Sequence, residues 1–190
     1  MFDLTSLWGL PAHPLFAHIP VVLIPLAAVG AVAMLWPRLR DRIGWIVVGI
    51  VFVAGITTQL AITSGKSLEE YVRETSLVRT HAQMGENIRP WVLLMFLALL
   101  AVMIIARMAQ RAEPPTDQSS STGETAVRTA PNGLRIAGIV ASVLSILFSA
   151  MAVYWIYRIG HSGSKAVWSP TQVKIDKGGG ERDGGGGDNG

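Results

Sequence analysis

Histidine is the residue type in this chain best suited to bind a metal ion or a haem. The chain has four histidines and no cysteine. His13 and His18 stand close together in the segment HPLFAHIP, residues 13–20, at the start of the first long apolar run. Because cysteine is missing, thiolate-held iron–sulfur clusters and covalently attached c-type haem are excluded. A metal or haem site must therefore use histidine, methionine or carboxylate, and it requires histidines that converge in space.

The composition is that of an integral membrane protein. Of the 190 residues, 50% are hydrophobic and 15% are charged, and the mean hydropathy is +0.41, a balance that soluble domains rarely have. The lipid bilayer is therefore an expected partner. The net charge of +3 is too small to indicate binding to nucleic acid. The first ten residues contain Asp3 and no Lys or Arg, so the first apolar run lacks the basic start of a signal peptide and is expected to remain as a span.

Four apolar segments are long enough to cross a bilayer, for which ~20 helical residues suffice. They lie at about residues 14–36, 43–63, 88–109 and 134–159. The expected fold is all-α, an integral membrane four-helix bundle over residues 1–173. A short extramembrane helix is expected between residues 64 and 80, and a disordered, low-complexity, glycine-rich tail over residues 174–190.

The ends of the third and fourth helices can be predicted more closely. Thr80 is expected to cap a third helix that begins at His81 and kinks at Pro90. The fourth helix is expected to end at residues 160–163, with sequence GHSG. Small residues at helical spacing on the fourth helix favour close approach of a neighbouring helix. These are Gly138, Ser142, Ser145 and Ser149.

The alternation of four spans places all four histidines on one side of the membrane. Consecutive spans run antiparallel, so the starts of the first and third helices meet the ends of the second and fourth. Three arginines crowd the loop at residues 38–42 on the opposite side, and loops rich in basic residues stay in the cytoplasm. We therefore expect a multi-pass protein with the histidines and both termini on the outer side.

His18 and His81 are the first candidates for a binding site. Pro20 removes a backbone hydrogen bond close to His18 and leaves a carbonyl group that could orient its second ring nitrogen. Gly85 follows His81 by about one helical turn and clears space for a flat macrocycle. The alternatives are that His18 is an interfacial histidine bonded to a carbonyl group and that His81 is a solvated loop residue.

Three further polar residues on this side have alternative interpretations. His161 lies between two glycines, where it is either a further ligand or part of a glycine-rich helix end. His13 is most simply a capping residue, and it is also a candidate metal ligand. Gln59, next to Thr57 and Thr58, either orients a ligand or takes part in hydrogen bonds between helices.

Several classes of function receive no support from the sequence. No Asp, Glu, Lys or Arg lies in the middle of any predicted span, so the ionisable relay of a proton pump or ion-coupled transporter is missing. The sequence has no Ser-His-Asp pattern, no glycine-rich phosphate-binding loop and no HExxH zinc motif. Hydrolases and nucleotide-dependent enzymes are not indicated, no nucleotide is expected as a partner, and no catalytic residue is assigned.

The histidine motifs together resemble a known family. HPLFAHIP at 13–20, Thr80-His81 with a small residue one turn later, and GHSG at 160–163 are similar to motifs of the bacterial four-span membrane family catalogued as domain of unknown function 2231. The resemblance covers about residues 10–173. It implies a small haem-binding or redox-associated domain of the bacterial inner (cytoplasmic) membrane, with the outer side in the periplasm. Members are sometimes fused to Rieske or cytochrome domains.

We therefore expect a membrane-bound electron-transfer subunit that binds a b-type haem near the outer membrane face. His18 and His81 are the expected axial pair, with His161 as the substitute, because facing helices of a bundle are a common place for haem. The protein would work in a larger complex with other membrane redox subunits rather than as a stand-alone enzyme. The alternative is a non-catalytic accessory or assembly subunit. Its histidines, His13 included, would be structural or would bind a divalent metal such as zinc or copper.

Overall fold

The computed structural model describes residues 6–7, 10–69, 75–112 and 132–180. Helices make up nearly all of this part of the chain. They are α1 (Ala12–Ala33), α2 (Pro37–Glu69), α3 (Ser76–Asn87), α4 (Arg89–Ala112) and α5 (Asn132–Gly180). Two short antiparallel strands, β1 (Ser6–Leu7) and β2 (Leu10–Pro11), precede them. The predicted all-α membrane fold is confirmed, whereas the end of the predicted tail, 181–190, lies outside the described residues.

In the described part of the chain, four helical stretches are long and apolar enough to span a membrane. They are Ala12–Ala33, Pro37–Glu69, Ser76–Ala112 and Asn132–Trp168. The shortest, α1, has 22 residues and is about 33 Å long, enough for a hydrocarbon core of about 30 Å. Large apolar side chains cover the outside of the bundle, such as Val29 with 69% of its surface exposed and Ile136 with 62%. An apolar exterior of this kind is suited to lipid rather than to water.

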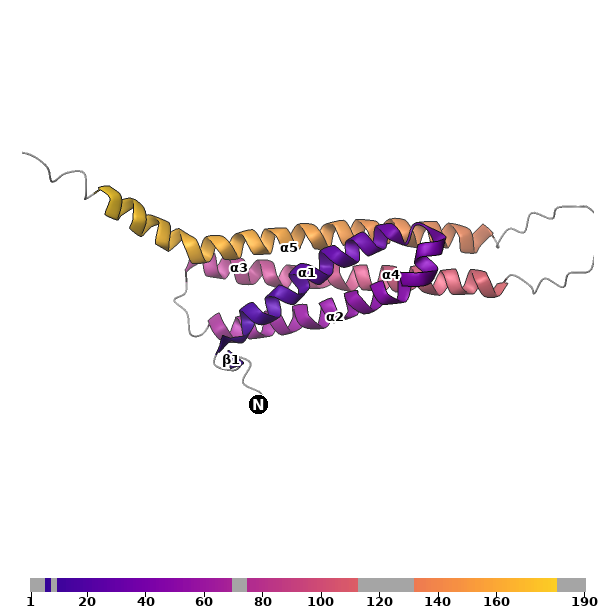
Figure 1. Ribbon diagram of the computed structural model, residues 1–190, viewed down its shortest axis with the longest axis horizontal. Coiled ribbons are helices and arrows are strands. Elements are labelled where there is room, and N and C mark those ends of the chain that lie inside the picture. The colour runs from indigo at the N-terminus through magenta and orange to yellow at the C-terminus, as the bar shows by residue number, and fades with distance from the viewer. Residues whose placement is uncertain (1–5, 8–9, 70–74, 113–131, 181–190) are drawn as a thin grey trace, which may run out of the picture.

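The helices form an elongated bundle (Figure 1). α1 packs on α2, α4 packs on α5, and the two pairs are joined by contacts of α1 with α5 and of α2 with α4. Buried residues recur every three or four positions, which is the spacing of one helical face. On α2 this face runs through Val47, Val51, Ala54, Thr58 and Ala61. The apolar core therefore runs along the length of the bundle.

Glycine lets the helices approach closely at two places in this core. A Cβ atom added to Gly30 of α1 would lie 2.6 Å from Cγ2 of Val47 on α2. One added to Gly44 of α2 would overlap the sulfur of Met103 on α4. Small residues at such crossings permit the close packing that holds membrane helices together, because lipid provides no hydrophobic driving force between them.

Gly30→Ala is expected to destabilise the bundle by about 1–3 kcal/mol, the usual cost of overpacking a core. Val47 is branched at Cβ, so it cannot turn its methyl groups away without leaving its preferred rotamer. Gly49→Ala is the matched control, because Gly49 is exposed and an added Cβ would meet no atom within 4 Å. Thermal unfolding in detergent measures the difference, and equal midpoints for the two variants would contradict the close contact.

The third helix begins and breaks at residues other than those predicted. Thr75 rather than Thr80 caps α3, since its backbone is extended (φ −122°, ψ 158°) and its Oγ1 accepts a hydrogen bond from the N–H of Val78 at 3.2 Å. The break comes at Ile88, between α3 and α4, and not at Pro90. Pro90 is the second residue of α4. A backbone N–H at this position has no acceptor within the helix, so proline loses no hydrogen bond there.

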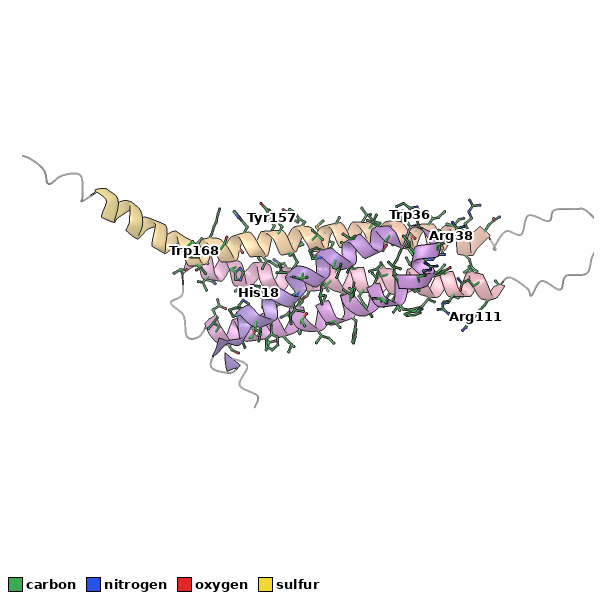
Figure 2. All side chains as sticks on the ribbon, viewed as in Figure 1. His18, Trp36, Arg38, Arg111, Tyr157 and Trp168 are labelled. Atoms are coloured by element: carbon green, nitrogen blue, oxygen red, sulfur yellow. The ribbon has the colours of Figure 1, made fainter. Side chains whose placement is uncertain are left out.

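α5 is longer than the predicted fourth span. It does not end at residues 160–163 but continues to Gly180, so the tail predicted from residue 174 begins as helix. Gly163 lies against a side chain from α3, and this contact offsets the cost of roughly 0.5–1 kcal/mol that a glycine adds inside a helix. Near Trp168 the helix turns away from the bundle (Figures 1 and 2).

The two ends of the bundle differ in chemistry. Figure 2 shows Tyr157 and Trp168 toward one end and Trp36, Arg38 and Arg111 toward the other. We call the first the histidine end, because His13 and His81 meet there, and the second the arginine end. Exposed tryptophans at both ends are typical of membrane–water interfaces. The histidine end and the arginine end therefore correspond to the two faces of the membrane.

Candidate functional site

Two histidines from different helices meet at the histidine end. His13 of α1 and His81 of α3 have ring centroids 6.2 Å apart, and their ring planes are nearly perpendicular, at 84°. Both side chains are half-buried. The fold thus brings together two imidazoles that are far apart in the sequence. We call them the histidine pair.

The register of α1 turns His13 toward α2. His13 lies seven positions, about two helical turns, before the buried Pro20. Its Nδ1 is 2.8 Å from the carbonyl oxygen of Ala61 on α2. Gly65, one turn further along α2, makes room for the ring, since an added Cβ would lie 2.9 Å from Nδ1 and 3.0 Å from Cε1. The carbonyl group of Ala61 and the space at Gly65, both on α2, therefore fix the position of the His13 ring.

α5 holds His81 in a similar way. Nδ1 of His81 lies 3.0 Å from Oγ of Ser162, and the Ser162 hydroxyl donates its hydrogen to the carbonyl oxygen of Ile159 at 2.9 Å. Gly163 makes room for the ring, since an added Cβ would lie 3.0 Å from Cε1 and 3.3 Å from Nδ1 of His81. Ser162 and Gly163 are the last two residues of the GHSG motif.

These contacts favour a hydrogen on Nδ1 of both rings. A carbonyl oxygen only accepts, so Nδ1 of His13 carries a hydrogen and donates it to Ala61. The Ser162 hydroxyl has used its hydrogen on Ile159 and therefore accepts from Nδ1 of His81. Nε2 of each neutral ring is then left with a lone pair for a ligand. Metal-binding histidines usually have this arrangement, in which the second nitrogen donates to an oxygen of the protein.

An exposed ion pair joins α2 to α3 at the same end. Nζ of Lys66 lies 2.5 Å from Oε1 of Glu86, and Lys66 directly follows Gly65. Exposed pairs of this kind contribute little to stability. The pair therefore adds one modest contact that keeps α3, and with it His81, against α2.

The structure pairs His81 with His13 and not with His18, which the sequence favoured. His18 is exposed, and its Nδ1 contacts the carbonyl oxygen of Pro14 on the same helix. Five positions separate His13 from His18, a rotation of about 140° around the helix, so the two side chains cannot share one face. The bond to Pro14 agrees with the interfacial alternative for His18.

The remaining candidates do not join the histidine pair. His161 is exposed and stacks on Tyr157, with ring centroids 6.2 Å apart and planes at 9°. The side chain of Gln59 is also exposed, and its amide donates within α2. Thr57 and Thr58 donate to carbonyl groups of their own helix. Ala61 and Ser162 therefore take the orienting role that the sequence suggested for Gln59 and its neighbours.

One family of known proteins matches most of the chain. The family described as predicted membrane protein (DUF2231) matches residues 9–175, a range that contains the whole histidine pair. The chain belongs to the DUF2231 family. This confirms the resemblance that the histidine motifs indicated. No curated protein and no solved structure gives a significant match.

The candidate site of this DUF2231 protein includes two glycines, Gly65 and Gly163, that were not predicted from the sequence. Their position in the helix register would have indicated both. Gly65 continues the buried face of α2 four positions after Ala61. Gly163 lies fourteen positions after the buried Ser149 on α5, which is two heptads and therefore nearly the same face. Ser162 is adjacent to Gly163. The glycines at 65 and 163 thus belong to the packed faces of their helices, which explains why each meets an imidazole.

The donor set fits a pair of axial haem ligands. The two ring centroids are 6.2 Å apart, so both rings could reach one metal ion, since imidazole–metal bonds are ~2.0–2.1 Å long. Haem iron needs only one or two protein ligands, whereas zinc takes three or four. Among the described residues, no group of three His, Cys, Asp or Glu is placed to hold a metal ion. Gly85, where an added Cβ would meet no atom within 4 Å, leaves open space one turn beyond His81.

Proposed function

We propose that this protein is a membrane-bound electron-transfer subunit in which His13 and His81 bind a b-type haem through their Nε2 atoms. The observation that carries the proposal is the histidine pair itself. Its two half-buried rings are 6.2 Å apart, and both engage the protein through Nδ1. The haem, when bound, supplies a one-electron redox couple. This pair replaces His18 and His81 as the expected ligands.

Ligation by two histidines favours electron transfer over chemistry on a small molecule. With His13 and His81 both holding the iron, the haem would supply one-electron redox chemistry rather than a site for oxygen or substrate. Ala61 and Ser162 hold the two rings from outside, so the ligands are already oriented before the cofactor enters. An electron carrier needs a donor and an acceptor. We therefore infer that the subunit works beside other membrane redox subunits.

A divalent metal ion is the second candidate ligand, and the protein would then be an accessory or assembly subunit. The lone pairs on Nε2 favour it as well, since neutral imidazole binds zinc and copper. Absorption spectroscopy and metal analysis of the purified protein separate the two proposals. Haem predicts a Soret band with reducible α and β bands. Colourless protein with stoichiometric zinc or copper would overturn the haem proposal.

We infer that the histidine end faces the periplasm of a bacterial inner membrane and that both termini lie on that side. The inference rests on Arg38, Arg40 and Arg42, which gather at the opposite end near the loop between α1 and α2. A reporter active only in the cytoplasm is expected to give signal when inserted between residues 113 and 131, and none when fused after Trp168. Signal after Trp168 and none between residues 113 and 131 would contradict the orientation and would leave the haem proposal unaffected.

A further inference from the structure

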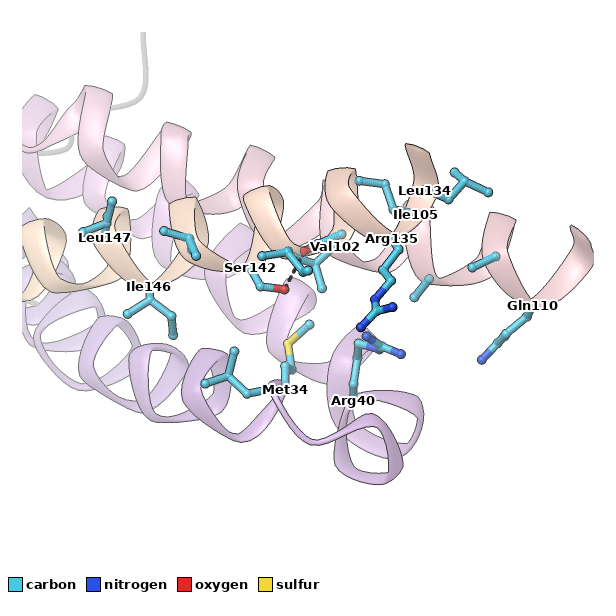
Figure 3. A pocket seen from close by; sticks show the side chains of 16 residues that line it. Met34, Arg40, Val102, Ile105, Gln110, Leu134, Arg135, Ser142, Ile146 and Leu147 are labelled. Atoms are coloured by element: carbon cyan, nitrogen blue, oxygen red, sulfur yellow. Dashed lines mark hydrogen bonds between the residues drawn. The ribbon is translucent and has the colours of Figure 1, made fainter. Parts of the chain in front are cut away.

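A cavity of about 690 Å³ lies at the arginine end, with lining residues from the turn after α1 and from α2, α4 and α5. Its volume is within the range of about 300–1,000 Å³ that is usual for ligand sites. No histidine lines it, so it is separate from the histidine pair. Most of its lining is apolar. Val102, Ile105, Ile146 and Leu147 belong to it (Figure 3).

Two arginines stand at one end of this cavity. Arg40 of α2 and Arg135 of α5 both line it, and Figure 3 shows their guanidinium groups pointing toward one another. Like charges that converge without an anion between them repel. None of the 16 lining residues is acidic. The arrangement therefore favours an anionic ligand between the two guanidinium groups.

The surroundings of Arg40 strengthen this argument. Its Nε atom is buried and has no hydrogen-bond partner among the described residues. Oδ1 of Asp41 lies 3.9 Å away, within ion-pair distance but too far for a hydrogen bond. The same oxygen accepts a hydrogen bond from the Gln110 amide at 3.3 Å. A buried guanidinium nitrogen that lacks an acceptor is costly, so a ligand that supplies an acceptor would stabilise it.

The apolar part of the cavity opens toward lipid. Ile139, Val143 and Leu147 of α5 line it, and 57%, 52% and 57% of their surfaces are exposed. Arg135 lies in the first turn of α5, where the helix dipole adds positive potential. The cavity is therefore an amphiphilic groove, with a cationic end at the membrane interface and an apolar body along the span.

We propose that this groove binds one anionic phospholipid. The phosphate lies between Arg40 and Arg135, and an acyl chain lies along the apolar side of α5. Guanidinium groups suit phosphate because they donate two parallel hydrogen bonds. Basic pockets between membrane helices are a recurring way to bind anionic headgroups. The proposal is independent of the haem proposal, since the two sites lie at opposite ends of the bundle.

Native mass spectrometry of the full-length protein tests the headgroup contacts. The protein is released from nanodiscs that contain palmitoyl-oleoyl phosphatidylglycerol and the matching phosphatidylcholine in equal amounts. One phosphatidylglycerol is expected to stay bound in preference to phosphatidylcholine. Arg40→Gln/Arg135→Gln is expected to lower its retention about tenfold or more. Arg38→Gln/Arg111→Gln is the matched control, because it removes two exposed arginines at the same end and is expected to keep the lipid.

A second variant tests the acyl-chain part of the groove. Ser142 lines the groove, so Ser142→Leu is expected to displace the phospholipid while both arginines stay in place. Arg135→Gln alone, at an exposed position, keeps the test usable if the double variant does not fold. No preference for phosphatidylglycerol, equal loss in both double variants, or retention unaffected by Ser142→Leu would each overturn the proposal.

Discussion

Replacing either His13 or His81 by alanine is expected to lower the affinity for haem about 100-fold or more. Each ring supplies one of the two axial bonds, and even the loss of a residue that only orients a metal ligand costs about 10–100-fold in affinity. His18→Ala and His161→Ala are the matched controls. Both side chains are exposed, so both variants are expected to keep the full spectrum. Haem titration followed by absorbance measures the four affinities.

The four variants also discriminate between the histidine pair and the ligands that the sequence favoured. Size-exclusion chromatography shows whether each variant remains folded, so that loss of haem is not confused with loss of structure. An unchanged spectrum in His13→Ala together with loss of haem in His18→Ala would restore His18 as the ligand. It would also contradict the register of α1 described above.

Gly163→Leu is expected to remove haem binding almost as completely as loss of His81. An added Cβ at this position would lie 3.0 Å from Cε1 of His81, so the larger side chain must push the ring away from Ser162. The rigid helix backbone cannot yield instead, because α5 is held by its own hydrogen bonds. Haem titration and the oxidised spectrum measure the effect.

Gly160→Leu is the control for this variant. Gly160 lies on the same helix, is exposed, and would have no atom within 4 Å of an added Cβ. Haem binding is therefore expected to stay within about twofold of the native value, as is usual for a surface substitution away from a site. Equal loss of haem in Gly160→Leu and Gly163→Leu would show that α5 does not position His81 through a close contact.

The membrane class and the number of spans could be predicted because they depend on bulk properties. Long apolar runs separated by charged loops leave few alternatives once the backbone must satisfy its own hydrogen bonds in lipid. The family could also be recognised, because HPLFAHIP and GHSG are short, contiguous motifs that can be identified without knowing the fold. These features required no knowledge of which helix face is buried.

The choice between His13 and His18 could not be made from the sequence. Residues 14–36 are apolar on all sides of the helix, so no polar stripe reveals which face meets the bundle. The decisive facts are that Pro20 is buried and that Ala61 lies within 2.8 Å of His13. Both arise from packing between α1 and α2, and neither can be read from the local sequence.

The ends of the third and fourth helices could not be predicted from residue types alone. Residues 160–163 contain two glycines and read as a helix end, yet Gly163 is needed inside the helix because His81 lies against it. Thr80 has the right residue type for a cap, but its hydroxyl donates to the carbonyl of Ser76 inside α3. Thr75, also a threonine, forms the cap instead. In both cases local propensity permits two outcomes, and at Gly163 the contact with His81 selects one.

The absorption spectrum of the reduced, haem-loaded wild-type protein, recorded before and after addition of carbon monoxide, tests the central claim most directly. If His13 and His81 both hold the iron, the protein would bind one haem per chain, and its reduced spectrum would change little on addition of carbon monoxide. A protein that takes up no haem, or whose reduced spectrum shifts with carbon monoxide, would contradict ligation by the histidine pair.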